Sequence, residues 1–168
     1  MKILQQGATL EEEATQSLCS MFAGNESFGI STEKIREVLG EKDLERIPMA
    51  PSFIAGVVPY RGDILTTISF RALLGLPESD GLGCVLVMEE EAGHDRFGLV
   101  VDRVGGVIAV DPRTLEANPS TLDPKYKWLF DGVYKTAMGV LIQLDPRKLR
   151  PSRITESGMF RQFAAEGA

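Results

Sequence analysis

The chain has 168 residues with a hydrophobic fraction of 43%, a composition that indicates a folding chain and excludes an intrinsically disordered one. Its length fits one domain or two small, intimately joined lobes. The net charge of −6 and the lack of any run of Lys or Arg argue against nucleic acid as a partner, because a phosphate backbone requires a basic face.

The N-terminal residues predict a short helix and no targeting signal. Thr9 and Glu12 have the spacing of a capping box, which favours an acidic helix over about residues 10–16. This region lacks the apolar core of a signal peptide, and the apolar stretches elsewhere are too short to span a bilayer. We therefore expect a cytoplasmic protein without direct membrane insertion, in which residues 1–17 form an N-terminal extension.

Short strands separated by glycine and proline turns follow in chain order. One helical turn is expected among them, capped by Ser31, with Ile35, Val38 and Leu39 on one side. A short helix is expected over residues 71–74, and another begins with Asp145 as N-cap and Pro146 at the first helical position. The predicted strands are residues 18–23, 28–30, 56–60, 64–70, 84–89, 96–102, 107–110, 132–135 and 139–144.

The turns between these strands carry the most specific local signals. Gly62 permits a positive φ, so Arg61-Gly62-Asp63 predicts a tight hairpin. Gly105-Gly106 indicates a bulge or bend. The Gly56 hairpin and the Gly132 hairpin also resemble each other: each has a glycine, a strand, a turn, a second strand and a short helix. Such a pattern favours an all-β sandwich or barrel with two similar lobes.

Few residues suit catalysis or metal binding. The one histidine, His94, lies in a polar hairpin tip, and no standard catalytic or nucleotide-binding motif is present. Cys19 and Cys84 stand among apolar residues, so we expect two free thiols in a reducing compartment rather than a disulfide framework. We expect no metal and no cofactor, and the apolar strands together with a hairpin arginine indicate an interaction module.

Residues 30–149 resemble the CheW-like domain family in the order and spacing of short motifs. Two departures stand out: Pro59-Tyr60 replaces the usual Asn and apolar residue, and Ser69-Phe70 replaces the usual Asp-Leu. The N-terminal helix and the C-terminal tail lie outside the resemblance. The motifs are Ile35-Arg36-Glu37-Val38-Leu39, the proline-flanked residues 47–57, Arg61-Gly62, residues 70–75, residues 98–104, Gly132-Val133 and residues 141–145.

The resemblance implies an all-β fold of two intertwined five-stranded, SH3-like β-barrel lobes with short helices. The CheW-like domain would span residues 18–150, and residues 151–168 would form a tail. The implied function is a non-enzymatic adaptor that couples a methyl-accepting chemoreceptor to a CheA-type histidine kinase in chemotaxis signal transduction. The implied receptor-binding residues are Ile35, Glu37, Gly56, Arg61, Val104 and Val107, and the implied kinase-binding residues are Ile30 and Ile47.

Each of these residues also has a structural interpretation. Arg61 could form a structural salt bridge to a carboxylate of its own lobe. Glu37 could be an ordinary exposed charge on a helix, and Val104 and Val107 could be core residues. Two other functions also stay open. One is a CheW-like scaffold of a non-flagellar chemosensory array, or a fragment of a larger signalling protein. The other is a small β-barrel hydrolase or ligand binder, which requires a pocket with convergent titratable groups.

Overall fold

The computed structural model describes residues 15–91, 93 and 95–156. His94 and most of the helix expected over residues 10–16 therefore lie outside the described residues. Gln16 itself belongs to the first strand, which begins two residues before the predicted start at residue 18.

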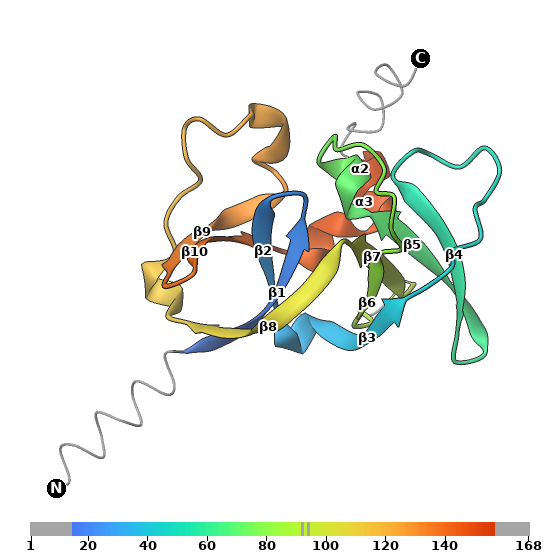
Figure 1. Cartoon of the computed structure of the whole chain (residues 1–168), viewed down its shortest axis with the longest axis horizontal. Coiled ribbons are helices and arrows are strands. Elements are labelled where there is room, and N and C mark those ends of the chain that lie inside the picture. Colours follow the sequence, from blue (N-terminus) through green and yellow to red (C-terminus); the bar gives the residue numbers. More distant parts are fainter. Residues whose placement is uncertain (1–14, 92, 94, 157–168) are drawn as a thin grey trace, which may run out of the picture.

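The fold consists of two five-stranded sheets with short helices, as Figure 1 shows. The strands of the first sheet run in the order β8-β1-β2-β10-β9, and those of the second in the order β3-β6-β7-β5-β4. The strands are β1 (Gln16–Ala23), β2 (Glu26–Ser31), β3 (Ile35–Glu41), β4 (Ile54–Tyr60), β5 (Asp63–Ser69), β6 (Cys84–Met88), β7 (Phe97–Val101), β8 (Arg103–Val110), β9 (Phe130–Thr136) and β10 (Gly139–Leu144).

The chain starts in the first sheet, builds the whole second sheet, and then returns to complete the first. The two sheets are thus intertwined, as expected, and each contains one parallel pair of strands, β2 with β10 and β5 with β7. A large apolar core joins the lobes; Phe28 and Phe130 from the first sheet and Leu86 and Leu99 from the second belong to it. Each lobe also has a smaller core of its own.

The two glycine hairpins occupy equivalent places in the two sheets, which confirms the internal similarity predicted from the sequence. Gly56 pairs with Thr67 and Gly132 with Gln143, and each glycine stands directly after a register shift in its strand pair. Val57 exchanges two backbone hydrogen bonds with Glu45, of 2.8 and 3.0 Å, and Val133 exchanges two with Glu116, both of 2.9 Å. The lobes are therefore related by an approximate internal repeat.

The expected helical turn over Ile35, Val38 and Leu39 was wrong. A 3-10 turn covers only Thr32–Lys34, and Ser31 makes no side-chain cap to it. Residues from Ile35 onward form β3, which pairs with β6. A bulge places two residues, Arg36 and Glu37, opposite Val87, and this extra residue breaks the strict alternation by which a strand is recognised.

The other local predictions were close. The bulge expected at Gly105-Gly106 is present in β8, where Ser20 Oγ donates a 2.6 Å hydrogen bond to the Gly106 carbonyl. The helix α2 spans Phe70–Leu73 and is capped by the Ser69 side chain. The Asp145 side chain accepts a hydrogen bond from the Arg147 N–H, at the start of the 3-10 turn Pro146–Leu149.

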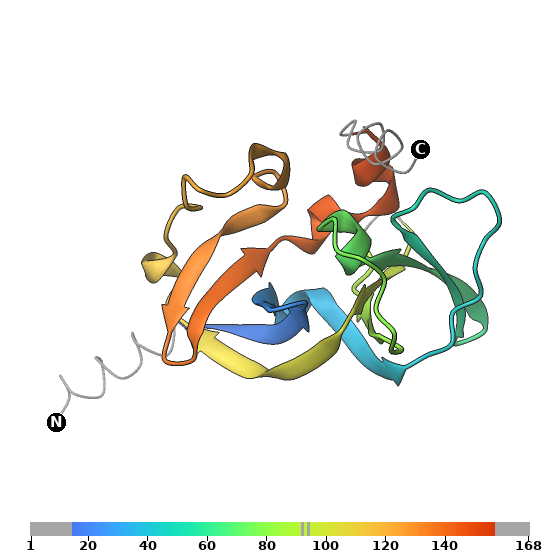
Figure 2. The same ribbon diagram turned by 45° about the horizontal axis from the view of Figure 1, so that its top comes forward.

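A last helix, α3 (Pro151–Glu156), follows this turn. Its Ile154 is fully buried in the large core, so the first part of the expected tail packs against the domain. In both ribbon views α3 lies beside α2 (Figures 1 and 2). Neither helix in the described part of the chain is long and apolar enough to cross a membrane.

Candidate functional site

The Arg61-Gly62 turn projects from the β4–β5 hairpin. Arg61 has φ +46° and Gly62 has φ +84°, and Tyr60 pairs directly with Asp63, so the hairpin closes through a two-residue turn with two positive φ values. A left-handed conformation is unusual for an arginine and is the geometry of a type I′ turn, which matches the twist of a hairpin. The Arg61 side chain is 63% exposed, as expected for a displayed cation.

Arg61 does not stand alone, because its guanidinium contacts the carboxylate of Glu37 on β3. The Arg61 Nη2 to Glu37 Oε2 distance is 3.1 Å, and the Tyr60 hydroxyl donates a 2.6 Å hydrogen bond to the same oxygen. The bond from Tyr60 lowers the pKa of Glu37 below its usual value, and the bond from Arg61 lowers it further. The bond to Glu37 in turn raises the pKa of Arg61.

Two residues of this cluster were missed as site residues from the sequence. In the sequence, Tyr60 was noted only as a departure from the family pattern. In the structure its ring makes cation–π contacts with two arginines: the guanidinium of Arg61 lies 5.5 Å and that of Arg96 5.7 Å from the ring centroid. Arg96 Nη2 also lies 3.0 Å from Glu90 Oε1. Arg96 stands far from Tyr60 in the sequence, so no local pattern indicated this contact.

Ile35 and Val104, two of the predicted receptor-binding residues, occupy equivalent positions in the two sheets. Ile35 is paired with Met88 and Val104 with Met21, and each stands just before the bulge of its strand. Both are half-buried and pack against the large core. Val107, beyond the bulge of β8, is 65% exposed. These outer strands, β3 and β8, lie along one side of the molecule in both ribbon views.

Gly56 has a structural role that its place in the candidate list did not reveal. It adopts φ +151°, and a Cβ there would lie 2.6 Å from the Glu45 carbonyl oxygen, closer than real Cβ contacts allow. Glycine is therefore required at this position by the approach of the backbone.

The two predicted kinase-binding residues differ in exposure. Ile30 is fully buried in the large core, so its side chain has no surface with which to contact a partner. Ile47 is 43% exposed and lies in the segment before β4. Met49, in the same segment, is fully exposed and has φ +64°. Met49 is thus a second exposed apolar side chain in this segment, and it was not predicted as a site residue from the sequence.

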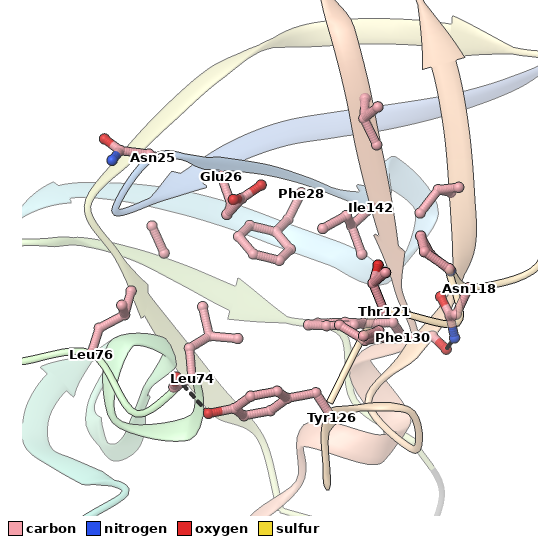
Figure 3. A pocket seen from close by; sticks show the side chains of 15 residues that line it. Asn25, Glu26, Phe28, Leu74, Leu76, Asn118, Thr121, Tyr126, Phe130 and Ile142 are labelled. Carbon is pink, nitrogen blue, oxygen red and sulfur yellow. Dashed lines mark hydrogen bonds between the residues drawn. The ribbon is translucent and has the colours of Figure 1, made fainter. Parts of the chain in front are cut away.

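An open groove of about 640 Å³ lies between the first sheet, the end of α2 and the segment before β9 (Figure 3). The Tyr126 hydroxyl closes one end by donating a 2.8 Å hydrogen bond to the Leu74 carbonyl. The wall is mainly apolar and carries one carboxylate, that of Glu26. Within the described residues, no group of three or more His, Cys, Asp or Glu side chains is placed to hold a metal ion.

The chain is similar to several known proteins. The chemotaxis protein CheW of Treponema pallidum is 26% identical over 136 residues, which cover 77% of this chain and 79% of that protein. The chemotaxis protein CheW of Klebsiella aerogenes is 28% identical over 144 residues, covering 84% and 85%. The crystal structure of the scaffolding protein TtCheW from Thermoanaerobacter tengcongensis matches with a TM-score of 0.67 at 24% identity, covering 77% of this chain and 88% of that one.

These similarities extend over most of the chain and agree with the two intertwined sheets. The match to the structure of TtCheW shows the fold. The family model of the CheW-like domain matches residues 18–152. On this match, the chain belongs to the CheW-like domain family.

Proposed function

We propose that this chain joins a methyl-accepting chemoreceptor to a CheA-type histidine kinase at the cytoplasmic end of the receptor. Its family membership makes it a chemotaxis coupling adaptor. Such a role requires two surfaces that bind different proteins and requires no catalytic step.

The observation that carries the receptor surface is the ion pair between Arg61, exposed at the end of the β4–β5 hairpin, and the partly exposed Glu37 on β3. Arginine suits an oriented contact with a partner because its planar guanidinium has several donors in a fixed geometry. Only one Arg61 nitrogen is used on Glu37 at 3.1 Å, so other N–H groups remain for a partner carboxylate or carbonyl. The exposed Val107 and the half-buried Ile35 and Val104 supply apolar area on the outer strands.

The kinase surface is proposed on the segment before β4, with Ile47 as the contact residue. The neighbouring Met49 extends its exposed apolar area, and a flexible thioether side chain adapts well to an apolar partner. Ile30 supports this surface only from within the core. Gly56 likewise supports the receptor surface through the backbone of β4 and makes no contact of its own.

We also propose that each five-stranded sheet closes on itself as a small barrel. In the second sheet β3 and β4 are the outermost strands, and the hydrogen bond from Tyr60 to Glu37 joins them directly. In the first sheet the outermost strands are β8 and β9, and Val110 and Tyr134 from these strands share one small core. Contacts between outermost strands are what a closed sheet requires.

The function is tested by measuring binding of the full chain to two purified fragments, a receptor fragment containing the cytoplasmic tip and the kinase's CheW-like domain. We expect both to bind at once. Arg61→Ala should weaken receptor binding about 5- to 150-fold, as for the loss of an interface anchor, and leave kinase binding unchanged. Arg113→Ala is the matched control, because Arg113 also forms an exposed ion pair, with Asp111 at 2.9 Å.

Three results would count against this assignment. Failure of the chain to bind the kinase fragment would contradict the coupling role itself. Binding of the kinase without any flagellar-type receptor would favour a scaffold of a non-flagellar array. A large loss of stability in Arg61→Ala with normal receptor affinity would show that Arg61 serves the fold and not the partner.

A further inference from the structure

Asp102 is the single residue between β7 of the second sheet and β8 of the first. The chain therefore crosses from one lobe to the other at this residue. The Asp102 backbone N–H donates a 3.0 Å hydrogen bond to the Phe22 carbonyl of β1, which holds the crossover against the first lobe. The Asp102 side chain is 25% exposed. A largely buried carboxylate thus lies where the two lobes meet.

This carboxylate binds one group from each lobe through the same oxygen, Oδ2. Gly24, in the turn between β1 and β2 of the first lobe, donates its backbone N–H at 2.8 Å. Arg71, on the helix α2 that follows β5 of the second lobe, donates from Nη1 at 2.6 Å. Arg71 Nε also donates a 2.7 Å hydrogen bond to the Pro77 carbonyl, which fixes its guanidinium. We call Asp102, Gly24 and Arg71 the interlobe cluster.

The interlobe cluster supplies directional contacts beside the apolar core that joins the lobes. Burial of apolar surface holds two lobes together but favours no particular angle between them, because it depends on area alone. Hydrogen bonds require defined distances and angles, and those to charged groups are short and strong. The Arg71 and Asp102 side chains are only 20% and 25% exposed, so water weakens this ion pair less than it weakens a surface pair. The cluster is therefore suited to fix the angle between the lobes.

That angle matters for the proposed receptor surface, because this surface draws on both lobes. Val104 and Val107 lie on β8, which begins directly after Asp102. Arg61 lies in the turn between β4 and β5 of the second lobe. A rotation of one lobe against the other would move the valines relative to Arg61. The proposed kinase residue Ile47 lies between β3 and β4, both of the second lobe, so a rotation would leave its surroundings in that lobe intact.

We propose that Asp102 and Arg71 are positioning residues of the receptor surface, which fix the angle between its two halves without touching the receptor. This inference rests on the receptor surface proposed above and adds to it the residues that set its shape.

Residual dipolar couplings of the full chain measure the relative orientation of the lobes. In the unmodified chain, couplings from both lobes should fit one common orientation. In Asp102→Ala and in Arg71→Ala, the couplings of each lobe should still fit that lobe alone, while the orientation between the lobes changes or is averaged over several angles. Arg71→Ala leaves the hydrogen bond from Gly24 in place, so it provides the same test should Asp102→Ala not fold.

Asp111→Ala is the matched control. The Asp111 side chain is 32% exposed and also accepts a backbone N–H, at 3.0 Å, and contacts a guanidinium, at 2.9 Å, but both groups come from Arg113 of the same connection. Lobe orientation and receptor affinity should therefore be unchanged in this variant.

Binding to the receptor and kinase fragments connects the angle to function. Receptor affinity should fall about 2- to 30-fold in Asp102→Ala and in Arg71→Ala, the usual range for residues that act on a site they do not touch. Kinase affinity should not change. The double variant should lose no more than the larger single loss, because both residues act through one contact.

An unchanged lobe orientation in both variants would overturn the proposal, and so would a changed orientation with unchanged receptor affinity. An equal fall in kinase affinity would show a general effect on the fold and would also overturn it. If Arg61→Ala weakens receptor binding and these two variants do not, the receptor surface stands and only the positioning role fails. If the unmodified chain does not bind the receptor, or if none of the three variants weakens binding, the proposed receptor surface is wrong and the positioning role falls with it.

Discussion

The hydroxyl of Tyr60 donates a 2.6 Å hydrogen bond to Glu37 Oε2 and so connects the two outermost strands of the second sheet, β4 and β3. Arg61 binds the same carboxylate oxygen, and Arg96 lies over the other side chain of the pair, the Tyr60 ring. The cluster therefore joins a proposed partner surface to a contact between the two outermost strands of the second sheet.

Tyr60→Phe removes this hydroxyl and keeps the ring. We expect the melting temperature to fall by about 2 to 4 °C, the usual effect of a lost interaction of 1 kcal/mol in a chain of this length. Receptor affinity should also fall, since Glu37 and Arg61 lose a common anchor. Tyr126→Phe is the control: it deletes a 2.8 Å hydrogen bond to the Leu74 carbonyl, away from the cluster. Equal receptor affinities in the two variants would contradict a positioning role for Tyr60.

The Glu37 carboxylate makes stability depend on pH in a defined direction. Its pKa in the folded chain lies below the ordinary value of 4.5, chiefly because of the hydrogen bond from Tyr60 and next because of that from Arg61. The ionised form thus stabilises the fold above pH 4.5, and this contribution is lost as the pH falls through the lower folded pKa. The difference in unfolding free energy between the unmodified chain and Glu37→Gln should be constant near neutral pH and shrink in acid. A difference that grows in acid would contradict this.

Gly56 and Gly132 should respond alike to alanine, because they hold equivalent places in the two lobes. The new Cβ would lie 2.6 Å from the Glu45 carbonyl oxygen in the first case and 2.5 Å from that of Glu116 in the second. Each variant should lose about 1–3 kcal/mol of stability in denaturant unfolding. Gly40→Ala, where nothing lies within 4 Å of the new Cβ, should change stability by less than about 0.5 kcal/mol. A stable Gly56→Ala variant with weakened receptor binding would instead make Gly56 a contact residue.

The two cysteines should differ in reactivity. Both are free; Cys19 is buried and Cys84 half-buried. Burial raises the pKa of the Cys19 thiol, which lowers the fraction of the reactive thiolate. A thiol reagent should therefore modify Cys84 first in the folded chain and both cysteines after unfolding, with Cys84→Ser as the control that isolates Cys19. Faster modification of Cys19, or a disulfide in protein prepared from cells, would contradict the expectation.

The sequence by itself determined the class of fold and the family, because both depend on local patterns. Apolar and polar residues alternate over a few positions of a strand. The residue types of Arg61-Gly62 and Gly105-Gly106 are enough to predict a turn and a bulge at those places. The order of such motifs along the chain was enough to identify the CheW-like domain. The same local reasoning misassigned β3 as helical, since the extra residue at Arg36-Glu37 shifts the period of the apolar side chains.

Only the tertiary structure decided which of the predicted site residues can meet a partner. Ile30 and Ile47 look alike in the sequence, yet the pairing of β2 between β1 and β10 buries the first, and the second remains exposed. Tyr60 contacts Glu37 because the outermost strands of the second sheet, β4 and β3, approach each other. Arg96 contacts the Tyr60 ring from the connection between β6 and β7. Contacts of this kind depend on strand order and on the curl of the sheet, which join residues far apart in the chain and leave no periodic signal in it.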